Sequence, residues 1–343
     1  MKKVLLVLFT ALTSFNVMSQ KGFSIVANKD NKQLDVLYNG KLLTAYCYYD
    51  SSMKPMLYPV NTVDGITVTR QYPFHIVPGE RTDHPHHTGI WMNYESVNGL
   101  DFWNNSTAID PAKRNAYGTI RHQKVISQKT NGNTASLVVA ANWIRPDKKV
   151  LLNEITHFNF TVNGNELIID RTSTLTATDT TVVFKDAKDG MLGFRVAREL
   201  ELPSKEKSSF VDDKGNVTVV PPSGAGVTGM YYSSEGLKGD SVWGTKGPWA
   251  MLTGVKNGKN ISIGIIDHPG NIGYPTYWHA RGYGLFAANP LGRKIFSNGK
   301  EELNFSLQPK QSTTFRHRII IRSGDVLTAT DMNRQENDFK KVK

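Results

Sequence analysis

The stretch THFNFTVNGNELIIDRTSTLTA, residues 156–177, contains two runs of alternating polar and apolar residues on either side of Asn163–Gly164. Successive side chains of a strand point to opposite faces, so this alternation predicts strands with one buried face. Asn and Gly tolerate the positive φ angles that a tight hairpin turn needs. The stretch therefore predicts a β-hairpin made of two long strands.

The same signals recur along most of the chain. TASLVVAANWI (134–144) and NISIGIID (260–267) are short runs rich in β-branched and apolar residues. Further Asn-Gly pairs stand at 39–40, 98–99, 131–132, 257–258 and 298–299. The best helix candidate is the tail after Asp325. We therefore predict an all-β fold, a large two-sheet antiparallel sandwich with few or no helices. We expect one domain over residues 20–343, with 203–227 as a long surface loop or hairpin.

The N-terminus has the layout of a secretory signal peptide. Lys2 and Lys3 precede an apolar run from Val4 to Leu12 and then small or polar residues. The run is too short to cross a bilayer, which takes about 20 apolar residues. We expect residues 1–19 to be removed and the protein to be exported, periplasmic or secreted, with no membrane attachment afterwards. The single Cys47 allows no intramolecular disulfide.

Composition and missing motifs narrow the function classes. The net charge is +11, which can attract anions, but Lys and Arg are scattered, so no nucleic-acid partner is expected. The chain has no GxSxG elbow, Walker loop, GxGxxG, HExxH or CxxC motif. The expected ligand is an oligosaccharide or another small polar molecule, and a basic exported protein could meet acidic glycans.

The densest group of ionisable side chains is RTDHPHHTGIW, residues 81–91, with three of the nine histidines. In an extended segment, His84 and His86 would point one way, and Asp83 and His87 the other. Two imidazoles on one side suit a divalent metal ion, so His84 and His86 are the candidate metal ligands. A carboxylate can fix an imidazole tautomer, so Asp83 and His87 are candidate catalytic residues. The alternative is a hydrogen-bonded loop.

Two further clusters combine ionisable and aromatic residues. Segment 266–292 includes His279, a second candidate catalytic histidine, among Tyr and Trp residues whose faces can stack on sugars. Segment 184–197 includes Asp189, a candidate catalytic carboxylate beside basic residues, and the alternative there is a salt-bridged turn. Over the three clusters, the residues predicted to bind substrate are Arg81, Trp91, Lys188, Arg195, Tyr277, Trp278, Arg281 and Asp267.

An ordered set of motifs resembles a family of exported bacterial proteins labelled methane oxygenase PmoA-like. The motifs are DHPHHTGIW (83–91), KDGMLGFRVA (188–197), WGTKGPW (243–249), DHPGN (267–271) and YWHARGYGLFAANPLG (277–292). The resemblance implies a supersandwich similar to galactose-mutarotase-like domains, with sugars bound on one sheet face. Mutarotases of that fold use a His acid and a Glu base. His87, His157 or His279 could match the acid, and no Glu clearly matches the base.

The sequence leaves three functions open. The leading hypothesis is a hydrolase, lyase or epimerase that acts on an oligosaccharide by His/Asp acid–base chemistry, with or without a divalent metal ion. The first alternative is a glycan-binding protein without catalysis. The second is a metal-dependent oxidoreductase, as the PmoA label implies.

Overall fold

The hairpin predicted from residues 156–177 is present. Strands β8 (Val150–Asn163) and β9 (Glu166–Ala177) pair antiparallel from Leu152↔Ala177 to Asn163↔Glu166. Buried residues alternate with more exposed ones along most of both strands, and the buried face combines apolar residues with the Glu154–Arg171 ion pair. The hairpin extends on both sides into a larger sheet by pairing with β7 (Thr134–Ile144) and β20 (Ser312–Ser323).

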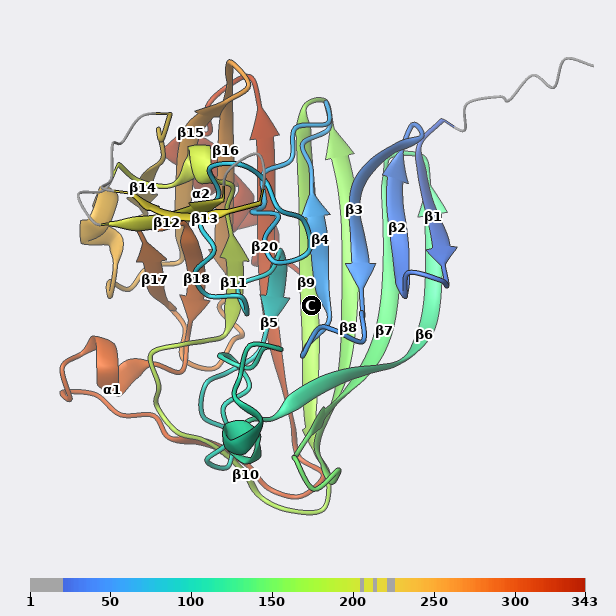
Figure 1. The fold of residues 1–343 in the computed structure, drawn as a ribbon, viewed down its shortest axis with the longest axis vertical. Coiled ribbons are helices and arrows are strands. Elements are labelled where there is room, and N and C mark those ends of the chain that lie inside the picture. Colours follow the sequence, from blue (N-terminus) through green and yellow to red (C-terminus); the bar gives the residue numbers. More distant parts are fainter. Residues whose placement is uncertain (1–20, 204–206, 212–214, 221–225, 343) are drawn as a thin grey trace, which may run out of the picture.

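The computed structural model describes residues 21–203, 207–211, 215–220 and 226–342, so the predicted signal peptide lies outside the described residues. Two eight-stranded antiparallel sheets lie one behind the other (Figure 1). Sheet A has the order β1 (Phe23–Asn28), β2 (Gln33–Tyr38), β3 (Lys41–Cys47), β4 (Met56–Val60), β5 (Ile90–Met92), β11 (Leu192–Arg195), β18 (Leu285–Asn289), β17 (Tyr277–Arg281). Sheet B has the order β14 (Met230–Ser233), β15 (Trp249–Lys256), β16 (Lys259–Asp267), β20, β9, β8, β7, β6 (Thr119–Asn131).

The remaining elements are short. Two small strand pairs are β10 (Val182–Phe184) with β19 (Phe305–Leu307), and β12 (Ser208–Val211) with β13 (Val217–Val220). The helices are α1 (Arg293–Phe296), α2 (Ala329–Phe339) and the 3-10 turns η1 (Pro111–Ala116), η2 (Arg198–Leu200) and η3 (Gly239–Val242). The predicted tail helix is thus confirmed as α2. Over the described ranges, no helix is long and apolar enough to cross a bilayer.

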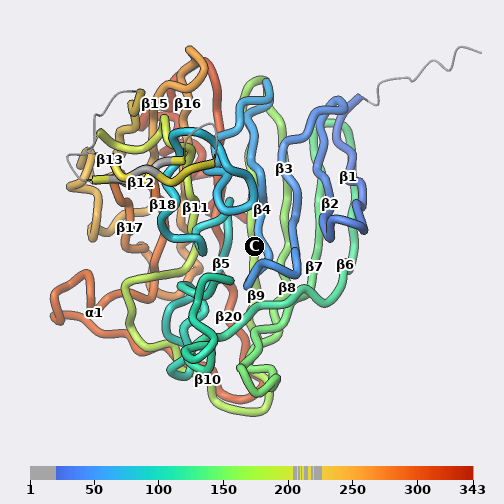
Figure 2. The backbone as a smooth tube through the Cα atoms, in the orientation of Figure 1, coloured from blue at the N-terminus to red at the C-terminus, as the bar shows by residue number. Residues whose placement is uncertain are grey.

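The main core lies between the two sheets. Ile319 and Ile321 of β20 and Phe158 of β8 contribute from sheet B, and Val36 of β2 and Phe194 of β11 from sheet A. This arrangement confirms the prediction of an all-β, two-sheet antiparallel sandwich. Each sheet takes strands from both halves of the chain (Figure 2), so both halves are needed to build either sheet. The prediction of one domain over 20–343 is consistent with this and stays a prediction.

The outer face of sheet A carries several of the candidate site residues. Trp91, Gly193, Ala287 and His279 are successive partners across β5, β11, β18 and β17. The neighbouring row, which includes Phe194, faces the core between the sheets. The row of Trp91 therefore faces away from sheet B, toward the loops that cover sheet A.

Gly193 is required by the packing of Trp91. A Cβ at Gly193 would lie 2.4 Å from the Trp91 ring, far inside contact distance. We expect Gly193→Ala to lower the free energy of unfolding by about 1–3 kcal/mol, as overpacked core positions do. Gly282→Ala is the control, because a Cβ there would meet no atom closer than 3.4 Å. Urea unfolding of both variants checks this, and equal stabilities would contradict the packing account.

Candidate functional site

The histidine-rich segment forms a turn over the outer face of sheet A. The His87 N–H donates to the His84 carbonyl at 2.9 Å, and His84 has a φ of 43°. The predicted extended alternation of His84 and His86 against Asp83 and His87 is therefore wrong. Pro85 follows His84 inside this turn, which explains why the period-two pattern does not hold.

The turn brings four rings into contact. The rings of His84, His87 and Tyr283 are parallel, with centroids 4.8 Å apart for His84–His87, 5.0 Å for His84–Tyr283 and 6.3 Å for His87–Tyr283. His87 in turn stacks on Trp91 at 5.3 Å. Tyr283 belongs to the turn between β17 and β18, so the stack joins two sequence clusters that are far apart in the chain.

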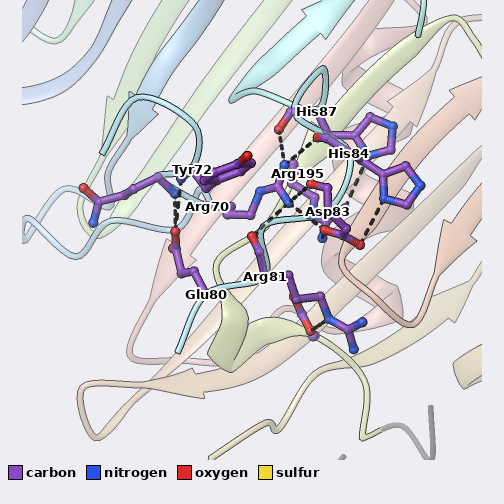
Figure 3. A network of polar contacts seen from close by, with 10 residues as sticks. Arg70, Tyr72, Glu80, Arg81, Asp83, His84, His87 and Arg195 are labelled. Carbon is purple, nitrogen blue, oxygen red and sulfur yellow. Dashed lines mark hydrogen bonds and ion pairs between the residues drawn. The ribbon is translucent and has the colours of Figure 1, made fainter. Parts of the chain in front are cut away.

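A buried ion-pair network fixes this turn to sheet A (Figure 3). Asp83 Oδ1 accepts from Arg70 Nη1 at 2.8 Å and from Arg195 Nη2 at 2.7 Å. Both guanidiniums have almost no exposed surface. Arg70 also donates to the carbonyls of His84 and His87, at 2.8 and 3.0 Å. We call Arg70, Asp83 and Arg195 the arginine–aspartate lock.

Asp83 is ionised because of this network. Burial alone would raise the pKa of its carboxyl, but the hydrogen bond from His84 and the two guanidiniums outweigh burial and hold the pKa well below the usual range. Its second oxygen, Oδ2, lies 3.0 Å from His84 Nδ1. A carboxylate in this position keeps the proton on Nδ1 and leaves Nε2 of His84 as the basic nitrogen.

His84 is the exposed member of the cluster, and His86 and His87 lie behind it. The side chain of His84 is 40% exposed, whereas His87 is buried. His87 Nε2 lies 3.2 Å from Trp103 Nε1, and its Nδ1 lies 3.3 Å from Arg195 Nη1. Burial lowers the pKa of His87 well below its ordinary value and that of His86 to about 2, so both are neutral. A neutral imidazole can accept from only one of these two donors, and His87 supports the ring of His84 from the buried side.

A second polar group lies on the same face. His279 of β17 is buried, and its Nδ1 lies 3.4 Å from Asp189 Oδ1. Burial lowers the pKa of His279 to about 3, with Lys188 and Arg281 acting in the same direction. Burial raises the pKa of Asp189. The two pKa shifts run in opposite directions, so a proton on this pair favours the Asp189 carboxyl over His279, and Asp189 is the member with some exposed surface.

Two more carboxyls adjoin Asp189. The Asp189 N–H donates to Glu95 Oε2 at 3.0 Å, and the Glu95 N–H donates to the Asp189 carbonyl at 2.9 Å. Burial raises the pKa of both Glu95 and Asp101, and the charge of Asp101 also raises the pKa of Asp189. The pKa values of Asp189, Glu95 and Asp101 are therefore all raised by their shared surroundings.

Cations and aromatic rings border the two groups. The Arg281 guanidinium lies 5.7 Å from the ring centroids of both Tyr283 and Trp243, and Arg195 lies 4.9 Å from that of Tyr283. Trp243 is 38% exposed, and Lys188 is exposed beside Asp189. The site thus offers flat aromatic faces next to hydrogen-bond donors, which suits a hydroxylated ligand.

Four predicted site residues lie elsewhere. Arg81 is buried in an ion pair with Glu201 at 2.7 Å, and Tyr277 is buried against Phe296. Trp278 belongs to the core between the sheets, and Asp267 is fully buried, with its Oδ1 3.7 Å from His317 Nε2. These positions correct the prediction that Trp278 and Asp267 bind substrate, because both lie in the interior. Arg81 was also predicted to bind substrate, and it is instead paired with Glu201.

Two residues absent from the sequence prediction belong to the site. Arg70 completes the lock, and Lys54 is buried with its amine 5.2 Å from the Trp91 ring centroid and 2.6 Å from the His86 carbonyl. Burial lowers the pKa of Lys54 to about 7. Neither stands in a local motif, so only tertiary structure reveals them. His157, in contrast, is exposed in β8, between the buried Thr156 and Phe158.

The metal prediction gains no geometric support. In the described part of the chain, no three His, Cys, Asp or Glu side chains gather as ligands. His84 Nδ1 is committed to Asp83, and the ring of His86 lies nearly perpendicular to that of His84, 5.6 Å away. The divalent ion at His84 and His86 stays a prediction.

The family model of DUF6807, described as a family of unknown function, matches residues 33–336. The chain belongs to the DUF6807 family. The predicted PmoA-like label finds no support in the matches. None of the curated proteins matches this DUF6807 chain in sequence.

Solved structures similar to this DUF6807 protein are remote. The GH36 alpha-galactosidase AgaB from Geobacillus stearothermophilus is 12% identical, with a TM-score of 0.41, over 88% of this chain and 41% of that one. A galactose mutarotase-like protein from Lactobacillus casei ATCC 334 is 10% identical, with a TM-score of 0.30, over 88% of this chain and 100% of that one. The DUF6807 chain thus spans about two fifths of the alpha-galactosidase.

The lock predicts a stability effect. Asp83→Asn leaves two buried guanidiniums without their ion-pair partner, so we expect it to cost about 3 kcal/mol or more of unfolding free energy. Asp179→Asn removes an exposed carboxylate that pairs with Lys310, and it should cost less than about 1 kcal/mol. Urea unfolding at neutral pH measures both, and equal losses would show that the lock does not hold the turn.

Buried neutral His279 predicts a pH effect. Its pKa of about 3 lies below the ordinary value of about 6.5, so the unfolded chain binds a proton first and stability falls as pH drops through this range. His279→Gln removes this contribution. We therefore expect the difference in unfolding free energy between wild type and variant to shrink as the pH is lowered from 7 to 4. A difference that does not change with pH would contradict the assignment.

Proposed function

We propose that this protein is an exported carbohydrate-active enzyme that acts by proton transfer, with His84 as base and Asp189 as acid. The observation that carries the proposal is the Asp83–His84 pair at 3.0 Å, held by two buried arginines under a partly exposed imidazole. This arrangement fixes a tautomer and presents a basic nitrogen to the outer face.

The acid is Asp189. Burial raises its pKa, so the carboxyl keeps its proton closer to neutral pH than a free aspartate does. His279 stays neutral behind Asp189 and borders the carboxyl from the protein side, with its Nδ1 3.4 Å from Asp189 Oδ1. His87 holds the stack in place behind His84.

The reaction class favoured by these residues is a lyase or epimerase reaction. Removal of a proton next to a carbonyl or carboxylate leaves negative charge that Arg281 and Lys188 can neutralise. Hydrolysis by paired carboxylates is less well supported, because Asp83 is fully used by Arg70, Arg195 and His84. A sugar ring would stack on Tyr283 and Trp243.

One observation favours glycan binding without catalysis. Trp243 is an exposed aromatic residue next to Arg281, and such a pair alone can hold a sugar. A binder would depend on Trp243 and Tyr283 and be indifferent to the proton on Asp189. The experiment below separates the two functions.

Turnover of an oligosaccharide panel tests the proposal. His84→Gln and Asp189→Asn should each lower kcat about 100-fold or more, the usual contribution of an acid or base, with smaller changes in binding. His157→Gln is the matched control, because His157 is exposed away from the site. The rate of wild type should fall at high pH as Asp189 loses its proton, and Asp189→Asn should lack this limb.

Two results would contradict the proposed enzyme function or the role of His84. If wild type binds an oligosaccharide and turns over none, and if only Trp243→Ala and Tyr283→Ala weaken binding, the protein is a glycan binder. If His157→Gln loses as much activity as His84→Gln, the assignment of the base is wrong.

A further inference from the structure

A hollow of about 510 Å³ lies where the start of β6, the turn η1 and the end of β7 meet. Four basic residues line it, namely Arg114, Arg121, Arg145 and Lys148. We call this hollow the basic pocket. Its other walls include the side chains of Asn105 and Tyr117. It therefore combines several positive charges with neutral hydrogen-bonding groups in one concave space.

The positive charges of the basic pocket are poorly compensated. Arg145 pairs with Asp147 at 3.2 Å, but within the described ranges no carboxylate forms an ion pair with Arg114, Arg121 or Lys148. Arg121 instead donates to the Ser52 carbonyl at 2.6 Å, and Arg114 donates to the Thr107 carbonyl at 3.2 Å. Like charges gathered in a hollow repel each other, and an anion there removes the repulsion.

The basic pocket adjoins the site through two shared segments. Met53 lines the pocket, and the next residue, Lys54, donates to the His86 carbonyl. Asn105 lines the pocket, and Trp103 of the same segment contacts His87. The basic pocket is therefore connected to the histidine cluster through two short segments of the chain.

We propose that the basic pocket binds a carboxylate or sulfate group of an acidic oligosaccharide, the class of substrate whose reacting sugar lies at the site of His84 and Asp189. This inference rests on the proposed function. Guanidinium groups match the planar geometry of carboxylates and the oxygens of sulfates, and charge-assisted hydrogen bonds are the strong ones. A single hollow suits one anionic group, whereas nucleic acid needs a row of phosphate contacts.

Binding of defined oligosaccharides tests the proposal. The pocket variant is Arg114→Gln/Arg145→Gln/Lys148→Gln, which leaves Arg121 and its bond to Ser52 in place. The control variant, Lys29→Gln/Lys124→Gln/Lys300→Gln, removes the same charge from exposed positions outside the pocket. Both are made in the Asp189→Asn background so that no probe is consumed.

The probes are a galacturonate tetramer, a sulfated heparin-derived tetrasaccharide, neutral xylotetraose and an oligonucleotide, measured by calorimetry at one salt concentration. We expect the pocket variant to bind one of the acidic oligosaccharides about tenfold or more weakly, because several charge-assisted contacts are lost. The control variant should stay within about twofold. The two acidic probes show whether carboxylate or sulfate is recognised.

Two results would overturn the proposal. Equal losses in the pocket and control variants would mean that only the overall charge matters, and tighter binding of the oligonucleotide than of any sugar would point to another partner. Turnover is measured in the pocket and control variants that keep Asp189. This measurement separates a failure of the pocket proposal from a failure of the proposed function. Pocket-dependent binding without turnover supports the pocket and contradicts the enzyme. Turnover of a neutral sugar that is equal in both variants contradicts the pocket alone.

Discussion

The site depends on the ion pairs that Asp83 makes with Arg70 and Arg195. Two guanidiniums with almost no exposed surface need a counter-charge, since an unpaired buried charge costs several kcal/mol. Asp83 supplies it from the loop above sheet A, while Arg195 belongs to β11 of the sheet itself. The loop is thereby fixed to the sandwich, and the same carboxylate orients His84. One interaction thus serves folding and the proposed chemistry.

The two aspartates of the site are driven in opposite directions by their surroundings. The lock and His84 lower the pKa of Asp83, while burial and the neighbouring Asp101 raise the pKa of Asp189. Such divergence is typical of sites that divide acid and base roles between similar groups. His84 and Asp189 both retain exposed side-chain surface above sheet A.

The sequence predicted the fold well because alternation is a local property. The hairpin 156–177 and the tail helix follow from periodicity and turn residues alone. The clusters around residues 84, 189 and 279 do meet, but the partners within them depend on strand pairing and on the turn after His84. That turn brings His84, not His87, to the surface. Arg70 and Lys54 stand in unremarkable segments, so only packing reveals them.

The tautomer of His84 is the most direct test of this account. In protein labelled with ¹⁵N in histidine, long-range proton–nitrogen correlation spectra at neutral pH distinguish the protonated ring nitrogen from the basic one. The account predicts a single tautomer in the wild type, with the proton on Nδ1 and a basic Nε2. It further predicts that Asp83→Asn loses this preference while the protein remains folded. A His84 ring with mixed tautomers in the wild type, or the same tautomer in both proteins, would contradict the claim that the lock positions the base.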